Sequence, residues 1–222
     1  MGTPRKKVNL GAQVEEVLRK RILNLEYPHN HVLVEEALCA EFGVSRSPVR
    51  EALRMLEAAD LTHKTSSRSY IVKQISQRGV KELYELRLAL ERYVVEGLCS
   101  LHNTAPIEAL LAHWQTVSME AEPDRAAADR VFHETLAELY GNNVMLEALR
   151  QINDRLRVFR VMDFARENRL GSTQAQHVAL LTAIVQKDVS KALEYLEMNV
   201  NEGMKNAVET LRQAILRAHE RE

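Results

Sequence analysis

Cysteine, glycine, proline and aromatic residues are all scarce in this chain. Its 222 residues include 2 Cys, 8 Gly and 5 Pro, and 5% are aromatic. Cys39 and Cys99 lie in apparently helical patterns, which is typical of buried thiols in a reducing compartment and not of a disulfide framework. Because Leu, Ala, Glu and Arg abound instead, the composition favours a mainly helical protein.

Long hydrophobic runs are missing as well. No apolar stretch approaches the ~20 residues needed to span a bilayer, and no signal-peptide core follows Met1. We therefore expect a cytoplasmic protein with no membrane partner. A hydrophobic fraction of 45% is still enough for a real core.

Charge is divided unevenly along the chain. Residues 1–75 contain 12 Lys and Arg against 9 Asp and Glu, a net charge of +3, whereas the remainder contains 18 against 22, a net charge of −4. The difference is small and proves nothing alone. Its sign fits an anion-binding N-terminal domain joined to an acidic second domain.

The first 75 residues predict a winged helix-turn-helix. Apolar periodicity predicts helices over about 10–25, 34–42 and 45–59, with Gly43 ending the second of them. The segment THKTSSRSYIVKQI (62–75) then reads as a small hairpin. Three helices followed by a hairpin, with 34–59 at the spacing of a tight turn and a recognition helix, are typical of this fold.

Residues 76–222 carry only long helical periods. They predict an all-α bundle of about six helices, over about 77–101, 105–121, 124–140, 143–168, 173–186 and 189–218. The overall expectation is a mainly α protein, with a winged helix-turn-helix over 1–75 and an all-α bundle over 76–222.

The helix that begins after Gly43 has positive side chains at its positive end, in FGVSRSPVREALRML (42–56). This arrangement indicates that something negative docks there. The hydroxyls of Ser45 and Ser47 and the free N–H groups can hold phosphates, while Arg46, Arg50 and Arg54 project on one face toward a DNA groove. In the wing, Lys64 and Arg68 can reach phosphates or a minor groove. The alternative is a solvated face whose arginines pair with Glu51 and Glu57.

These residues resemble a known family of bacterial regulators. EFGVSRSPVREALRMLEAADL (41–61) looks like the signature of the GntR family, and ILNLEYPHNHVLVEEALCAEF (22–42) fits the segment that precedes it. Glu26 or its neighbour, Asn30, Asp60 and Ser69 stand where that family usually has glycine. The turns must therefore use residues for which the glycine backbone geometry is less favourable.

The second half is similar to the helical ligand-binding domain, of the FCD type, found in the FadR-like branch of that family. The similarity rests on three segments: VKELYELRLALERYVVEGL (80–98), DRVFHETLAELYGNNVML (129–146) and HVALLTAIVQKDVSKALEYLEMNV (177–200). The resemblance covers roughly residues 10–210. It implies a homodimer that binds operator DNA and responds to a small effector.

Asp129 and His133 share a helix face with apolar residues, so both side chains are expected to point into the bundle. His177 lies on another apolar face, and Asn199 lies on the last helix. Asp oxygen with His nitrogens suits Zn, Ni or Mn. The resemblance implies that an Asp, His, His, His set binds a divalent metal, with Asn199 here in the fourth position. The alternative is a metal-free hydrogen-bond network of Asp129, His133 and His177.

Two arginines are candidates for binding the effector, which we expect to be a carboxylate. The resemblance places Arg87 beside the metal, although a salt bridge to Glu91 at i+4 is equally compatible with its position. Arg157 is the weaker candidate. Two other functions stay open at this point. One is a metalloenzyme with an open coordination position, and the other is a DNA-binding protein whose second domain only dimerises.

Overall fold

The computed structural model of the chain describes residues 9–23, 26–73, 76–117, 124–164 and 169–219. The chain divides into two compact units, one formed by Met1–Ile75 with Gln213–Glu222 and the other by Ser76–Arg212. Within the described ranges, no helix combines the length and the apolar character needed to cross a membrane.

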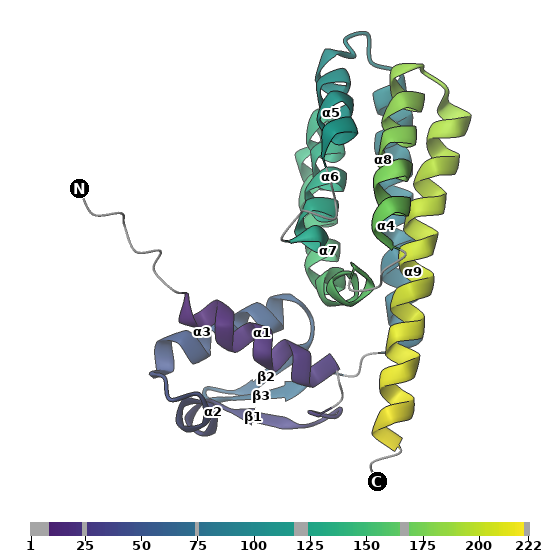
Figure 1. Cartoon of the computed structure of the whole chain (residues 1–222). Helices are drawn as coiled ribbons and strands as arrows, with labels where there is room; N and C mark the ends of the chain where they lie inside the picture. The colour runs from purple at the N-terminus through teal and green to yellow at the C-terminus, as the bar shows by residue number, and fades with distance from the viewer. Residues whose placement is uncertain (1–8, 24–25, 74–75, 118–123, 165–168, 220–222) are drawn as a thin grey trace, which may run out of the picture. The chain divides into compact units, whose positions relative to one another are not determined.

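The first unit is the predicted winged helix-turn-helix (Figure 1). Its core forms where α1 packs on α3, with Leu18, Ile22, Val49 and Leu53 fully buried. A three-stranded antiparallel sheet has the order β1-β3-β2. The elements are α1 (Leu10–Leu23), β1 (Val32–Val34), α2 (Glu35–Phe42), α3 (Arg46–Ala58), β2 (Thr62–Ser66) and β3 (Ser69–Val72).

Strand β1 was not predicted from the sequence. The apolar period places Val34 in the second helix, but Val34 ends β1 and pairs with Ser69 of β3. The valines of β1 favour extended backbone, and their hydrogen-bond partner lies far along the chain. A local pattern cannot reveal such a partner, so the helix was predicted one residue too long.

Left-handed backbone occurs at two of the positions where glycine was expected. Asn30 has φ 67° and Asp60 has φ 58°. Asn and Asp tolerate this conformation better than other non-glycine residues. Ser69 lies in β3 and is not among the residues of positive φ, so the geometry expected at the wing tip is absent there.

The second unit is the predicted all-α bundle, with α4 in contact with α6, α7 and α8 (Figure 1). The predicted helical residues 24–25, 118–121 and 165–168 lie outside the described residues. Helix α8 begins before the predicted start at 173. The helices are α4 (Gln77–Cys99), α5 (Ala105–Thr116), α6 (Arg125–Tyr140), α7 (Asn143–Phe164), α8 (Arg169–Val185) and α9 (Val189–His219).

The interior of this bundle is not purely apolar. Large side chains such as Tyr84, Phe132 and Leu156 are fully or almost fully buried. Beside them lie buried charged and polar residues from α4, α6, α7 and α8: Arg87, Glu91, Asp129, His133, Arg160 and His177. Buried ionisable groups are costly unless they are paired or ligate a metal. This group therefore marks the candidate site of the second unit.

Candidate metal centre and nucleic-acid interface

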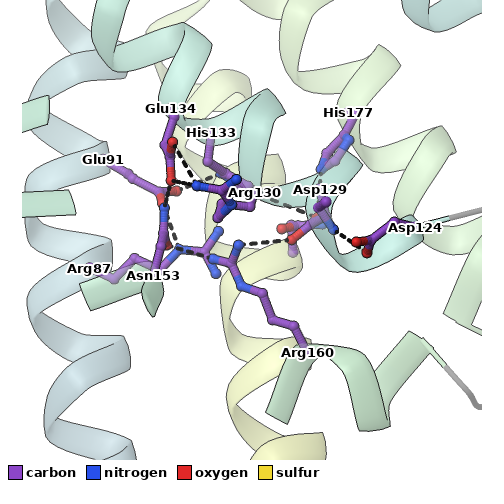
Figure 2. A network of polar contacts seen from close by, with 12 residues as sticks. Arg87, Glu91, Asp124, Asp129, Arg130, His133, Glu134, Asn153, Arg160 and His177 are labelled. Carbon is purple, nitrogen blue, oxygen red and sulfur yellow. Dashed lines mark hydrogen bonds and ion pairs between the residues drawn. The ribbon is translucent and has the colours of Figure 1, made fainter. Parts of the chain in front are cut away.

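Three of the predicted metal-ligating residues converge inside the bundle. Asp129 and His133 lie one turn apart on α6, and His177 comes from α8 (Figure 2). Their exposed fractions are 3%, 1% and 0%. One ligand atom from each lies within 4.8 Å of the others.

The separations between these atoms fit a shared metal ion. Oδ1 of Asp129 lies 3.3 Å from Nε2 of His177 and 3.6 Å from Nε2 of His133. Two ligands at about 2.0–2.1 Å from a tetrahedral zinc ion would lie about 3.4 Å apart. Both separations exceed the usual 2.7–3.2 Å (about 2.9 Å on average) of an N–H···O hydrogen bond.

Two of the ligand atoms also lack another partner. Among the described residues, neither Oδ1 of Asp129 nor Nε2 of His133 has a hydrogen bond. Burial alone would raise the pKa of Asp129, but the nearby His133 and His177 outweigh burial and hold it well below its usual value. The carboxyl is therefore in its ligating, ionised form, and the three side chains could bind a metal.

Glu91 supports the cluster from α4, a role that the sequence analysis did not assign to it. Its Oε2 lies 2.8 Å from Nδ1 of His133, and its Oε1 accepts a hydrogen bond of 2.6 Å from Nε of Arg87. Burial alone would raise the pKa of Glu91, but Arg87 and His133 lower it to about 2. An ionised carboxylate beside Nδ1 favours a proton on that nitrogen and leaves Nε2 free to ligate.

Arg87 has the salt bridge to Glu91 that the sequence offered as the alternative to effector binding. The pair is almost fully buried. Burial alone would lower the pKa of Arg87, but Glu91 and Asp129 outweigh burial and raise this pKa above its usual value. Nη2 of Arg87 has no hydrogen bond among the described residues. Its guanidinium therefore has both a structural partner and a donor that could still bind an anion.

Arg160, on α7, is a buried residue that the sequence analysis missed. Its Nη1 lies 3.5 Å from Oδ2 of Asp129, on the opposite carboxylate oxygen from the histidines. Its Nη2 donates to Asn153 at 2.8 Å, and Asn153 donates in turn to Glu134 at 2.9 Å (Figure 2). Asn153, Leu156 and Arg160 lie at helical spacing on one face, and this pattern could have revealed the arginine.

Arg157, the weaker effector candidate, is exposed and borders a cavity of about 220 Å³ between α6 and α7. Arg160 also lines this cavity, and its Nη1 lies 3.5 Å from Oδ2 of Asp129, so one buried residue borders both the cavity and the cluster. The lining residues are Asp124, Ala126, Ala127, Arg130, Asn153, Asp154, Arg157, Arg160 and Val161.

Aromatic rings fix the orientation of His177. The ring of Phe132 stacks on it with centroids 3.6 Å apart and an interplanar angle of 12°. Trp114 contacts it edge-on at 4.5 Å. Asn199, the predicted fourth ligand, is 3% exposed on α9 and donates from Nδ2 to Oε1 of Gln176 at 2.9 Å. Its place among the ligands remains a prediction.

In the first unit, α3 presents the predicted DNA-binding side chains to solvent. Ser45 is the N-cap residue, in extended backbone and without a side-chain cap bond. Arg46, Ser47, Arg50 and Arg54 are exposed. Arg50 does not pair with Glu51 or Glu57, as the alternative required. Its Nε donates instead to the buried Glu35 of α2 at 2.9 Å.

The wing carries the two remaining predicted contacts. Lys64 of β2 and Arg68, in the turn between β2 and β3, are both exposed. The ammonium of Lys64 lies 5.9 Å from the ring centre of Tyr70. Both positive charges therefore remain accessible to a phosphate backbone.

Comparison with known proteins gives two family matches. Residues 10–72 match the model of bacterial regulatory proteins of the gntR family, and residues 82–202, more than half of the chain, match the FCD domain. The gluconate operon transcriptional repressor of Bacillus subtilis is 32% identical over 59% of this chain and 55% of its own length. The transcriptional repressor NanR of Salmonella newport is 28% identical over 89% of this chain and 85% of its own.

A solved structure supports the fold. It is the structure of Lar, which controls the expression of the Listeria monocytogenes agr system. This chain matches it with a TM-score of 0.69 and 18% identity, over 92% of this chain and 98% of that one. At this identity the likeness shows the fold alone.

Proposed function

The chain belongs to the GntR family of bacterial transcriptional regulators and carries an FCD domain, and we propose that a small carboxylate, bound beside a divalent metal, modulates its binding to operator DNA. One observation carries the proposal. The same chain has an exposed arginine face on the second helix of a helix-turn-helix and a buried Asp, His, His cluster in a helical bundle. In this proposal residues 1–75 bind DNA, and residues 76–222 bind the effector and dimerise.

DNA binding is assigned to α3 and the wing. Helix α3 enters the major groove, where arginine binds guanine through two hydrogen bonds. Arg46, Arg50 and Arg54 recur every four residues on one exposed face. Hydroxyls of Ser45 and Ser47, with Lys64 and Arg68 of the wing, contact phosphates and set the register of the protein on the duplex. Because operator DNA lies in the cytoplasm, this function places the protein there.

The metal is assigned to Asp129, His133 and His177, with Asn199 as the fourth ligand. One carboxylate oxygen and two imidazole nitrogens suit Zn, Ni or Mn. When bound, the metal supplies a Lewis-acidic position that an effector carboxylate can occupy. Arg87 and Arg157 add positive charge for the same anion, and Arg160, which lines the cavity together with Arg157, adds a third guanidinium.

The effector can regulate DNA binding only if it binds one arrangement of the protein more tightly than another. The cluster is suited to this coupling because its members and supports come from different helices. Glu91 lies on α4, Asp129 on α6, Arg160 on α7 and His177 on α8. A ligand that moves one of these side chains therefore changes the packing of several helices and shifts the placement of the two DNA-binding domains.

The partner in the dimer is a second copy of the chain. Leu86 and Tyr93, seven residues apart on one face of α4, are large apolar side chains with exposed fractions of 52% and 56%. A self-complementary contact between two such faces buries them and gives two-fold symmetry. The two recognition helices then read half-sites of a near-palindrome, set about one or more helical turns apart.

The alternatives are weaker. The matched relatives are transcriptional regulators and not enzymes, so the metalloenzyme hypothesis has no support from them. A second domain that only dimerises would not need a buried Asp, His, His cluster. Specific binding of a small carboxylate would exclude that alternative.

Selection from a random duplex library tests DNA recognition without knowledge of the operator. We expect the full chain to enrich an inverted repeat. Arg50→Ala should weaken binding to it by roughly 5- to 150-fold, the ~1–3 kcal/mol of one bidentate contact. Arg78→Ala is the matched control, because Arg78 is exposed on α4 and ion-paired with Glu82. Enrichment of no sequence, or equal affinity of the two variants, would contradict the proposal.

A further inference from the structure

We infer that Gln176 and Glu202 are positioning residues of the metal centre: together they orient the side-chain amide of Asn199 so that its oxygen, and not its NH2 group, is presented as a ligand. The inference rests on the proposed metal site and extends it to two residues with no assigned role. It concerns the one position where this chain departs from the ligand set that its family resemblance implies.

A chain of hydrogen bonds joins α8 to α9. Nε2 of Gln176 donates to Oε2 of Glu202 at 2.8 Å, and Nδ2 of Asn199 donates to Oε1 of Gln176 at 2.9 Å. Ser172, one turn before Gln176, also approaches Glu202, with Oγ 3.4 Å from Oε1. Gln176 directly precedes the proposed ligand His177 in α8.

The direction of this chain of bonds follows from Glu202. A carboxylate only accepts hydrogen bonds, so Gln176 must face it with its NH2 group. The carbonyl oxygen of Gln176 is then the atom that faces Asn199, and an oxygen acceptor requires a donor. Asn199 must therefore turn its NH2 group toward Gln176 and its oxygen away from it. One acidic residue thereby fixes the orientation of two amides.

This orientation decides whether Asn199 can serve as a ligand. An amide binds a divalent cation through its oxygen, whereas its NH2 group is a pure donor that a cation repels. Imidazole, which the family pattern has at this position, needs only the correct tautomer. An amide needs the correct one of two orientations of similar shape. Gln176 and Glu202 favour the orientation in which the oxygen of Asn199 faces away from Gln176.

The test is a metal-affinity measurement on the metal-free full chain, by competition of Zn²⁺ with a chelator. Glu202→Gln replaces a pure acceptor with an amide that can also donate, so the direction of the hydrogen bonds from Asn199 through Gln176 is no longer fixed. We expect Zn²⁺ affinity to fall about 10- to 100-fold, the usual effect of losing an outer partner of a ligand. Glu147→Gln is the matched control, because Glu147 on α7 is exposed and also faces a glutamine, Gln151.

Asn199→Asp separates orientation from a general effect of charge. The two oxygens of the introduced carboxylate are equivalent, so either end can ligate. We expect this variant to bind Zn²⁺, and we expect Glu202→Gln to lower the affinity less than about threefold in its background. Melting of the metal-free variants checks folding. If Glu202→Gln does not fold, Gln176→Met takes its place, because it removes both hydrogen bonds of Gln176 without a change of charge.

Three outcomes would overturn the inference. The first is a wild-type affinity in Glu202→Gln. The second is an equal loss in the wild-type and Asn199→Asp backgrounds, which would mean that Glu202 acts through its charge alone. The third is that neither the wild type nor any variant binds Zn²⁺. That result would remove the proposed metal site itself, and it is distinguishable from the other two because the wild type binds metal in both of those.

Discussion

Nδ1 of His133 lies 2.8 Å from Oε2 of Glu91, which comes from a different helix. Glu91 is in turn held by Arg87 one turn earlier on α4. A carboxylate on the far nitrogen of a metal-ligating histidine fixes its tautomer and ring orientation and raises its basicity. Helix α4 thus contributes to the candidate metal centre without supplying a ligand.

Glu91→Gln should weaken Zn²⁺ binding about 10- to 100-fold, because the neutral amide no longer favours a proton on Nδ1 of His133. Glu82→Gln provides the control on the same helix, since Glu82 also pairs with an arginine four residues earlier but is exposed. Chelator competition measures both. Equal affinities in the two variants would show that Glu91 only neutralises Arg87.

Glu35→Gln should lower the sequence specificity of DNA binding. Glu35 is buried and holds Nε of Arg50, whose side chain is 47% exposed. Without this partner Arg50 is less ordered, so a contact worth ~1–3 kcal/mol is partly lost at the preferred sequence. Binding to unrelated DNA, which depends on total charge, should stay the same or strengthen.

The measurement is the ratio of affinities for the selected repeat and a scrambled duplex at one salt concentration. We expect this ratio to fall about tenfold. Glu36→Gln is the control, since Glu36 is the next residue of α2, is exposed, and loses the same charge on substitution. A ratio that falls equally in both variants would assign the effect to charge and not to the position of Arg50.

Tyr93→Glu and Leu86→Glu should dissociate the dimer, because each places a charge on the apolar face of α4 that the proposal buries between two copies. Sedimentation or light scattering at several concentrations measures the mass. We expect monomers where the wild type is dimeric. Val144→Glu is the control, since Val144 is 80% exposed on α7. Dimers that persist in both α4 variants would place the interface elsewhere.

Sequence patterns predicted what is local or periodic. The helical period, Gly43 at φ 63° and the polar hairpin were enough to predict the winged helix-turn-helix. Asp129 and His133 at i and i+4 on an apolar face indicated a buried site, and the structure brings His177 to them. The helices and the inward-facing side chains were predicted because each depends on spacing within one element, whereas the meeting of His177 with Asp129 and His133 was implied by the family resemblance.

The supporting residues could not be predicted in the same way. Strand β1 exists through pairing with β3, and Arg160 acquires a role only because α7 packs where its guanidinium reaches Asp129. Helix α8 was expected to begin at about 173, yet it begins at Arg169, and Oγ of Ser172 approaches Glu202. Helical spacing could have shown that Arg160 faces inward, but its partner, like those of β1 and Ser172, lies in a segment distant in the sequence, which no local pattern reveals.

The most direct test of the central claim is elemental analysis of the full chain, purified without chelator or affinity metal. We predict about one equivalent of Zn, Ni or Mn per chain, as a single site of this kind requires. It should be lost in the Asp129→Ala, His133→Ala double variant, with the DNA-binding unit intact. A metal-free wild type that takes up none of these ions on incubation would contradict the claim. Asp129, His133 and His177 would then belong to a pocket that binds no metal.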